Sequence, residues 1–497
     1  MVVTWELRAA FARGLAAMYG REVPAYETLV EVTREINAEV AGRDGADAER
    51  LGSVARVSAE RHGAIRVGTP RELAQAARVF AAFGMHPVGF YDLRDAGPGA
   101  VPVVSTAFRP LDADELARNP FRVFTSMLVV DDPRYFDADT RAGLQAFLAD
   151  RVLFPPELLT LADRAAAEGG LPERDAEALL CRATAAFALS SIPVDRAWYD
   201  HLDAISSVAA DIGGVPTTHL NHLTPRVLDI DELQARMRSR GIEMIDEIQG
   251  PPAWEGPDVL LRQTSFRALA EDRVFRYPDG SVRTGALRVR FGEVEQRGIA
   301  LTPRGRALYD RMVAEVDARG GGPDGAREVW RRHMPASERG LAERGLAFFT
   351  YRVASEETGG PSRWAPGVRK ATFRTRDDMK VAFQTQGRDV ELRALVDAGV
   401  LVPEPIVYED FLPRSAAGIF RSNLRGEGTR DEGRAAPEYD LARLAGVLGA
   451  TVHDPMDLYT AQQDASLCAA ARTLRVRIIP TDILPTTTLP TTTEETR

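Results

Sequence analysis

Cysteine is almost absent from this chain of 497 residues, in which Cys181 and Cys468 are the only two. Because they stand alone and far apart in the sequence, they form neither a zinc-binding nor a dithiol redox pattern. Lysine is equally scarce, and Lys370 and Lys380 are its only occurrences. Arginine therefore carries nearly all of the positive charge, and its planar guanidinium suits bidentate binding of carboxylates.

Long apolar segments are missing as well. No stretch approaches the ~20 apolar residues that a membrane span requires, and the charged helical pattern at residues 5–11 is unlike a secretory signal. The net charge of -10 and the pI near 5.4 argue against a general nucleic-acid surface. The glycine-rich run at 318–323 lacks the lysine and the helix start of a phosphate-binding loop. These absences predict a cytoplasmic protein that acts on small molecules, without membrane or nucleic-acid partners.

The remaining composition, 44% hydrophobic and 27% charged, is typical of a folded protein with a sizeable core. Strand and helix patterns are mixed along the chain, which predicts the α+β class. The expected organisation is N-terminal helices at 1–50, a first mixed module at 51–134, a helical insertion at 135–210, a second mixed module at 211–302, a helical and loop-rich region at 303–480, and a disordered Thr/Pro-rich tail at 481–497.

One motif occurs twice. The first copy runs from His62 to Arg66 and the second from His222 to Arg226; both have the form His-x-x-x-Arg, and an acidic helix start follows each. Two further segments, Ser-Thr-Ala-Phe-Arg at 105–109 and Gln-Thr-Ser-Phe-Arg at 263–267, follow at nearly equal offsets. Two signatures repeated together indicate a duplicated structural module.

Each module is expected to have the order strand, helix, strand, strand, strand. In the first, the sequence predicts strands at 64–67, 87–91, 101–108 and 121–130, with a helix from 70 to 84. In the second, it predicts a helix at 231–240, a hairpin turn at 278–281, and strands at 223–228, 241–245, 259–266, 273–277 and 287–295. Two such βαβββ modules that pair edge to edge form an open, cup-shaped sheet.

This cup-shaped arrangement of the two modules indicates a metal site. The first-strand histidines, His62 and His222, would face the same cavity, and the last strand of the second module supplies Glu293 where the first has Ser126. Two histidines and one carboxylate are typical of non-haem Fe(II) sites, which keep open positions for substrate and dioxygen. His219 remains an alternative to His222. Glu295 remains an alternative to Glu293, because strand side chains two residues apart share a face.

Six segments of the chain, among them those with His62, His222 and Glu293, resemble the 2-oxoadipate dioxygenase/decarboxylase family. Members of this family are similar to the vicinal oxygen chelate superfamily and to hydroxyphenylpyruvate dioxygenase. The resemblance implies an Fe(II)-dependent enzyme without an organic cofactor, which converts 2-oxoadipate and dioxygen into 2-hydroxyglutarate and carbon dioxide in lysine catabolism. It also favours Glu293 over Glu295. The segments that carry it are 17–24, 62–66, 221–224, 291–298, 408–413 and 415–420.

A dicarboxylate substrate requires a cation for its far carboxylate. Arg66 is four residues beyond His62, so both side chains face one side of the strand, and a guanidinium can bind a carboxylate bidentately. The family resemblance also implies Arg66 as the substrate anchor and catalytic arginine. Thr106 and Ser126 are expected to line the cup. Arg226 holds the equivalent place in the second module, where the preceding proline is expected to bend the strand.

Two other functions fit the same pattern. Related vicinal oxygen chelate enzymes are metal-dependent isomerases, lyases or extradiol dioxygenases, and glyoxalase-like members often use a fourth protein ligand. Ser126, at the expected place of such a ligand, favours the oxygenase. A non-catalytic small-molecule binding protein is the other alternative, although it would not need a complete metal triad. Residues 320–480 are expected to form a lid or pocket wall, and the oligomeric state stays open.

Overall fold

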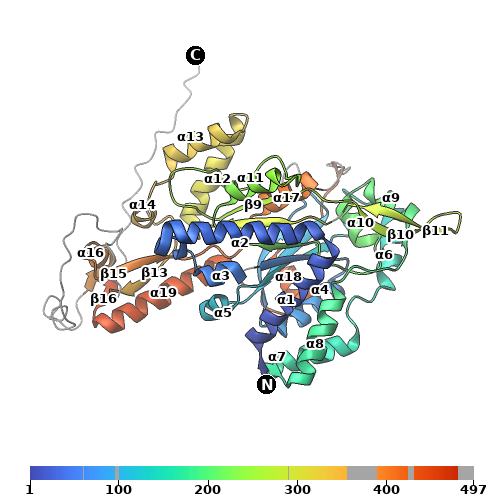
Figure 1. Ribbon diagram of the computed structural model, residues 1–497, viewed down its shortest axis with the longest axis horizontal. Coiled ribbons are helices and arrows are strands. Elements are labelled where there is room, and N and C mark those ends of the chain that lie inside the picture. The colour runs from blue at the N-terminus through green and yellow to red at the C-terminus, as the bar shows by residue number, and fades with distance from the viewer. Residues whose placement is uncertain are drawn as a thin grey trace, which may run out of the picture. The chain divides into compact units, whose positions relative to one another are not determined.

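The computed structural model describes residues 1–59, 61–95, 100–288, 290–354, 389–423, 430–431 and 433–479. Figure 1 labels its helices and strands. The chain divides into two compact units. The first unit comprises residues 1–253, 258–298 and 407–458, and the second comprises 254–257, 299–406 and 459–497. The predicted disordered tail at 481–497 lies outside the described residues.

A five-stranded sheet with the order β3-β4-β5-β2-β8 forms the centre of the first unit. Strand β2 pairs in parallel with β5, while the remaining neighbours pair antiparallel. The first module therefore has the predicted βαβββ order. Its elements are β2 (Arg61–Val67), α4 (Pro70–Ala81), β3 (His86–Asp92), β4 (Val103–Arg109) and β5 (Arg122–Leu128), with the short helix α5 (Ala113–Arg118) before the last strand.

The two modules meet edge to edge at β2 and β8, as predicted. Ala64 of β2 lies opposite His222 of β8 (His222–Pro225). A single bridge between Arg226 and Glu295 then links the end of β8 to β12 (Glu293–Arg297), which pairs antiparallel with β9 (Leu261–Ser265). Helix α11 (Ile230–Ser239) follows β8 in the chain and precedes the strands of this two-stranded sheet. The five-stranded and two-stranded sheets are therefore linked by the bridge at the end of β8.

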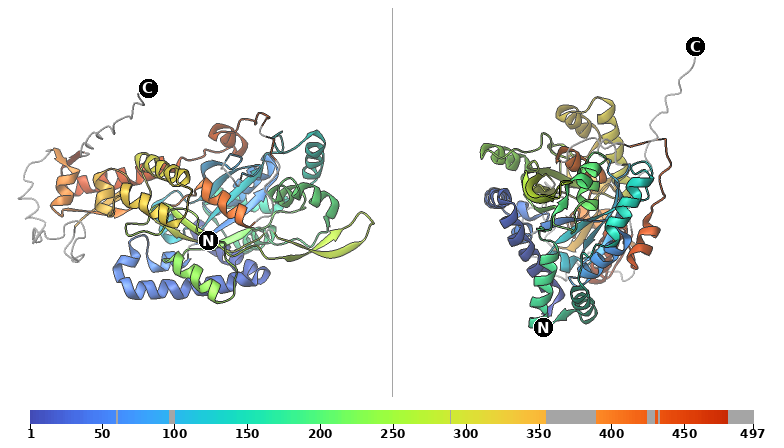
Figure 2. Two further views of the ribbon diagram at one scale, coloured as in Figure 1. Left: turned by 90° about the horizontal axis from the view of Figure 1, so that it is seen from above. Right: turned by 90° about the vertical axis from the view of Figure 1, so that its right-hand side faces the viewer.

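The second module departs from the predicted strands. The segment 241–245 is irregular, with one bridge between Met244 and Phe266. The strand predicted at 287–295 is broken, because Arg290 turns inward to pair with Glu22 and Glu271, and Gly292 packs too close to the Phe266 ring for any Cβ. The hairpin of β10 (Glu271–Arg276) and β11 (Val282–Leu287) leaves the central sheet to pair with β7 (Val194–Asp195), and it projects from this unit (Figure 2).

Helices cover the apolar face of the central sheet. Ile65 and Val67 of β2 and Val123 of β5 belong to one large core together with residues of α1, α4, α7 and α8. Because strand side chains alternate, His62, Ala64 and Arg66 point to the opposite face. Besides α4 and α5, the α-helices of this unit that precede β8 are α1 (Thr4–Glu22), α2 (Pro24–Asp44), α3 (Val54–Ala59), α6 (Ala138–Ala149), α7 (Pro156–Glu168), α8 (Glu173–Ala186), α9 (Arg196–Asp203) and α10 (Ser207–Gly213).

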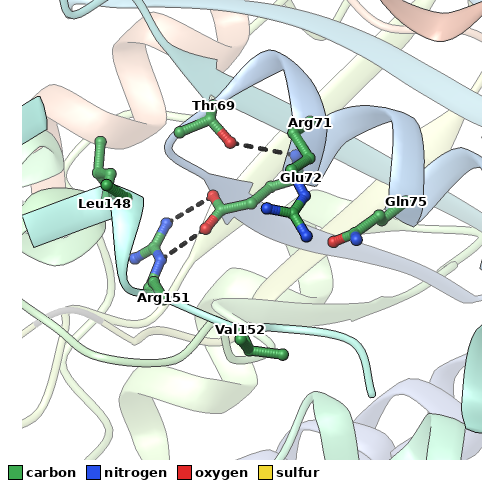
Figure 3. Close-up of a pocket in the computed structure, with 8 residues that line it drawn as sticks. Thr69, Arg71, Glu72, Gln75, Leu148, Arg151 and Val152 are labelled. Carbon is green, nitrogen blue, oxygen red and sulfur yellow. Dashed lines mark hydrogen bonds and ion pairs between the residues drawn. The ribbon is translucent and has the colours of Figure 1, made fainter. Parts of the chain in front are cut away.

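The start of α4 is clamped to the chain beyond α6. Thr69 caps the helix by accepting a hydrogen bond from the Glu72 backbone N–H, as expected for threonine at this position. The Glu72 carboxylate accepts two hydrogen bonds of 2.7 Å each from the Arg151 guanidinium, at a small pocket that Gln75 and Val152 also line (Figure 3). Both members of this ion pair are buried to more than nine-tenths of their side chains.

The described residues of the second unit form helices and two small sheets, and the sequence pattern did not predict these sheets. Strand β13 (Phe349–Val353) pairs with β15 (Leu401–Pro405), and β14 (Asp389–Glu391) pairs with β16 (Arg477–Ile479). Its helices are α12 (Pro303–Ala318), α13 (Pro323–His333), α14 (Glu338–Glu343), α16 (Leu392–Asp397) and most of α19 (Pro455–Leu474). Helices α17 (Pro413–Asn423) and α18 (Leu441–Leu448) belong to the first unit. None of the described helices has the length and apolar character needed to cross a lipid bilayer.

Candidate metal centre

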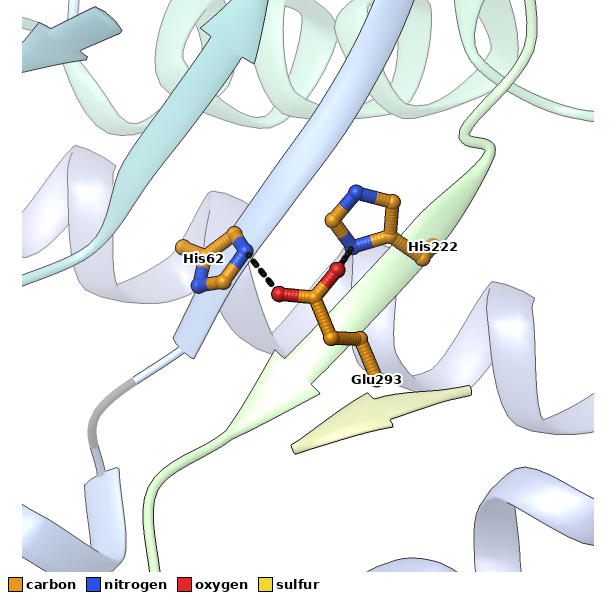
Figure 4. Close-up of side chains that lie close together, drawn as sticks. All are labelled: His62, His222 and Glu293. Atoms are coloured by element: carbon orange, nitrogen blue, oxygen red, sulfur yellow. Dashed lines mark ion pairs between the residues drawn. The ribbon is translucent and has the colours of Figure 1, made fainter. Parts of the chain in front are cut away.

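Three strands of the first unit bring His62, His222 and Glu293 together (Figure 4). Nε2 of His62 lies 3.4 Å from Oε1 of Glu293, and Nδ1 of His222 lies 3.6 Å from Oε2 of the same carboxylate. One potential ligand atom from each residue lies within 4.8 Å of the other two, and all three side chains are buried. Among the described residues, this is the one cluster of histidine, cysteine or acidic side chains with such spacing.

The spacing and the donor types fit a single metal ion. Donor atoms that each lie ~2.1 Å from one ion are themselves roughly 3–4 Å apart, which matches the separations around Glu293. Two imidazoles and one carboxylate suit iron, and this set leaves further coordination positions for small ligands. His62, His222 and Glu293 are therefore a complete candidate ligand set.

Glu295 lies behind His62. Its Oε2 is 2.8 Å from Nδ1 of His62, while Arg297 donates two hydrogen bonds to the carboxylate, at 2.7 and 2.8 Å. The ring thus presents Nδ1 to Glu295 and Nε2 to Glu293. Although burial would raise the pKa of Glu295, Arg297 and His62 hold this pKa well below its usual range. Glu295 is therefore an anion that supports the candidate ligand His62. The sequence had left it open as an alternative metal ligand to Glu293.

The surroundings shift the pKa values of the two histidines in opposite directions. Burial lowers the pKa of His222 to about 4, against the opposing effect of Glu293. Burial would also lower the pKa of His62, but Glu295 and Glu293 outweigh burial and raise it. The Thr224 hydroxyl lies 3.0 Å from Nδ1 of His222 and holds the ring. A neutral imidazole of this kind is the form that binds a metal.

A polar row crosses the same face of the sheet. Arg66 lies opposite Ser126 of β5, and Ser126 lies opposite Ser105 of β4, with the two serine hydroxyls 2.8 Å apart. The structure does not bring Thr106 to this face. Because Thr106 is adjacent to Ser105 on a strand, it points to the opposite face, where its hydroxyl donates to the Gly89 carbonyl at 2.7 Å. Ser105, which the sequence argument overlooked, takes its place.

His219 and Arg226 lie outside the cluster. His219 turns to Asp211, with Nε2 3.3 Å from the carboxylate, and does not approach His62. Arg226 is buried, and its guanidinium donates to the Leu51 carbonyl at 2.8 Å. The structure thus separates His222 from its competitor and gives the two motif arginines different surroundings, since Arg66 pairs with Asp211 at 2.5 Å.

An aromatic wall closes one side of the candidate metal centre. The Phe411 ring packs edge-on against His62 with centroids 5.0 Å apart, and it also contacts Phe124 and Tyr91. Phe291 stacks on His222 at 5.3 Å. Phe411 belongs to the region 320–480, for which a lid or pocket wall remains a prediction, and it places one ring of that region beside His62. Gln263, also overlooked in the sequence, donates a hydrogen bond to Glu293.

Comparisons with known proteins agree over nearly the whole chain. A family model described as 2-oxoadipate dioxygenase/decarboxylase matches residues 11–423. A relative of that name from Mycobacterium bovis is 53% identical over 458 residues, covering 92% of this chain and 96% of the relative. One from Pseudomonas putida is 40% identical over 488 residues, covering 95% and 97%. The crystal structure of hydroxyglutarate synthase from Pseudomonas putida in complex with 2-oxoadipate aligns with a TM-score of 0.77 at 38% identity, covering 95% of this chain and 99% of that chain.

Proposed function

The chain belongs to the 2-oxoadipate dioxygenase/decarboxylase family, and on that premise we propose that it converts 2-oxoadipate and dioxygen into 2-hydroxyglutarate and carbon dioxide with Fe(II) as its cofactor. The observation that carries this proposal is the convergence of His62, His222 and Glu293 on the sheet face that also bears Arg66. Such a reaction would be a step in lysine catabolism.

His62, His222 and Glu293 would hold the iron. When bound, Fe(II) supplies a Lewis-acid and redox centre with open positions, where a 2-oxo acid and dioxygen can meet. Glu295 keeps His62 turned toward Glu293, and Gln263 holds Glu293 by a hydrogen bond. Partners of this kind in the second layer commonly orient metal ligands.

Arg66 would bind the far carboxylate of the substrate. Four residues along a strand span roughly 13 Å, so His62 and Arg66 can address opposite ends of an extended six-carbon acid. The hydroxyls of Ser126 and Ser105 lie in the same row as Arg66 and offer further hydrogen bonds. The aromatic ring of Phe411 beside His62 would exclude water from the reacting end.

The proposed reaction balances without another reductant. The substrate loses its first carbon as carbon dioxide, one atom of dioxygen enters the new carboxylate at the former keto carbon, and the other becomes the hydroxyl on the adjacent carbon. The first carbon and the former keto carbon each lose one electron and the adjacent carbon loses two, which together supply the four electrons that reduce dioxygen.

The direct test is oxygen consumption by anaerobically purified, Fe(II)-loaded protein with 2-oxoadipate, with 2-hydroxyglutarate followed by mass spectrometry. We expect stoichiometric product, and its loss in His62→Ala and Glu293→Ala. His201→Ala is the matched control, because His201 stacks on Trp198 and belongs to α9 rather than to the cluster. Absence of oxygen uptake by iron-loaded wild-type protein would argue for another 2-oxo acid or a non-oxidative reaction.

A further inference from the structure

Arg66 is held by a buried carboxylate that no motif in the sequence marks. Its Nη1 donates to Oδ2 of Asp211 at 2.5 Å, and the two residues are only 5% and 4% exposed. Burial would raise the pKa of Asp211, but His219 and Arg66 lower it, so the carboxylate is ionised beside the guanidinium. A buried ion pair of this kind fixes both side chains, because breaking it would leave an uncompensated charge.

Asp211 is itself fixed from the second module. Asn221 donates a hydrogen bond of 2.9 Å to the same Oδ2, and Nε2 of His219 lies 3.3 Å from Oδ1. Thr218 in turn donates to the backbone carbonyl of Arg66 at 2.8 Å. Asn221 immediately precedes His222. The network therefore joins the predicted substrate anchor to the strand that carries the second candidate metal ligand.

The helix that carries Asp211 is anchored at its end. Arg151 donates to the carbonyls of Ile212 and Val215, at 2.5 and 3.0 Å, while it pairs with Glu72 (Figure 3). Glu72 also accepts a hydrogen bond of 2.6 Å from the backbone of Gly68, two residues beyond Arg66. One clamp thus holds both the end of β2 and the end of α10, on which Arg66 and Asp211 stand.

We infer that Asp211 is a positioning residue, which holds the Arg66 guanidinium in the orientation that receives the far carboxylate of a 2-oxo dicarboxylate. The inference rests on the proposed function. A guanidinium carries five N–H donors in a rigid fork, so a contact at Nη1 fixes the direction of the other donors. An arginine that is oriented in advance loses less conformational freedom when the substrate binds. Asp211 thereby sets the preference for a dicarboxylate over a 2-oxo acid with an uncharged end.

The test is a double-mutant cycle of Asp211→Asn and Arg66→Met. Dissociation constants of 2-oxoadipate and of 2-oxohexanoate, which ends in a methyl group, are measured by calorimetry on the metal-loaded protein without oxygen. Because a hydrogen bond between charged groups is lost, we expect Asp211→Asn to weaken 2-oxoadipate binding about tenfold or more. We expect less than about a twofold change for 2-oxohexanoate, and no added effect of Asp211→Asn when Arg66 is already Met.

Asp132→Asn is the matched control, because Asp132 is a buried carboxylate of the same unit that pairs with Arg134 and Arg94. It should leave both dissociation constants unchanged. Three results would overturn the inference: Asp211→Asn weakens the binding of both acids equally, its effect persists when Arg66 is already Met, or it leaves binding unchanged. Wild-type turnover of 2-oxoadipate would in each case still support the proposed function. Wild-type protein that binds neither acid would overturn both.

Discussion

Oε2 of Glu295 and Nδ1 of His62 lie 2.8 Å apart in the interior of the first unit. The same ring turns Nε2 toward Glu293, at 3.4 Å. A carboxylate behind a histidine fixes which ring nitrogen carries the proton and makes the other a better metal ligand. The two glutamates of β12, which share a face and are equivalent by spacing, therefore have separate roles.

Glu295→Gln should weaken metal binding without abolishing it. The amide retains the size of the side chain but loses the negative charge that faces His62 and Arg297. Changes in such supporting groups typically lower metal affinity by about 10- to 100-fold. Calorimetric titration of the metal-free protein with Fe(II) or Mn(II) measures this. The control is Asp132→Asn, which changes a buried carboxylate in a different ion-pair network and should bind metal as the wild type does. Unaltered metal affinity in Glu295→Gln would contradict the role assigned to Glu295.

Ser126 and Thr106 should differ in their effect on activity. Ser126→Val places methyl groups in the polar row beside Arg66, so we expect a clear loss of turnover with 2-oxoadipate. Thr106→Val acts on the opposite face, where it removes the hydrogen bond to Gly89. It should cost about 1 kcal/mol of unfolding free energy and leave turnover nearly intact. Steady-state kinetics and urea unfolding together separate the loss of turnover from the loss of stability. Equal losses of turnover in both variants would contradict the placement of Ser126 and Thr106 on opposite faces of the sheet.

The repeated motif predicted the architecture well because it marks the two strands at which the modules meet. The sequence could not show register, however. Arg66 lies opposite Ser126 on β5, whereas the equivalent Arg226 is bridged to Glu295 on β12. Ser126 is therefore the counterpart of Glu295 rather than of Glu293, whose counterpart is Phe124. The predicted serine at the place of a fourth ligand is therefore wrong, because the aromatic side chain of Phe124 occupies that place.

For the other residues of the site, the sequence patterns indicated a place in the site only weakly or not at all. Gln263 stands in the repeat at the position of Ser105, so strand alternation applied to both copies would have directed these two to the sheet face that carries His62 and Thr106 to the opposite face. Asp211 and Phe411 lie outside the repeat. They reach β2 only through tertiary packing, with Phe411 nearly 350 positions from His62 in sequence. Local patterns carry no information on such contacts.

The metal-free protein should lose stability as the pH falls from about 6.5 to 4. Burial lowers the pKa of His219 to about 4, despite the opposing charge of Asp211. In this window the unfolded histidine takes up a proton and the folded one does not, so acid favours unfolding by on the order of 3 kcal/mol. Urea unfolding at pH 7 and 4.5 measures the loss. His219→Gln should reduce this difference, while His201→Gln, on α9, should leave it unchanged; the same pH difference in both variants would refute the assignment.

Phe411→Leu should uncouple oxygen consumption from product formation. The Phe411 ring contacts His62 and Phe124, and a smaller side chain there opens space beside the candidate metal centre. Water that enters a reacting site diverts reactive species from the intended path. We therefore expect the ratio of dioxygen consumed to 2-hydroxyglutarate formed to rise above that of the wild type, with metal affinity retained. An oxygen electrode with mass spectrometry of the product gives this ratio. Phe275→Leu, which alters a buried ring that packs on Tyr199 instead, controls for a general loss of packing, and an equal rise in both variants would show that the wall beside His62 has no special part.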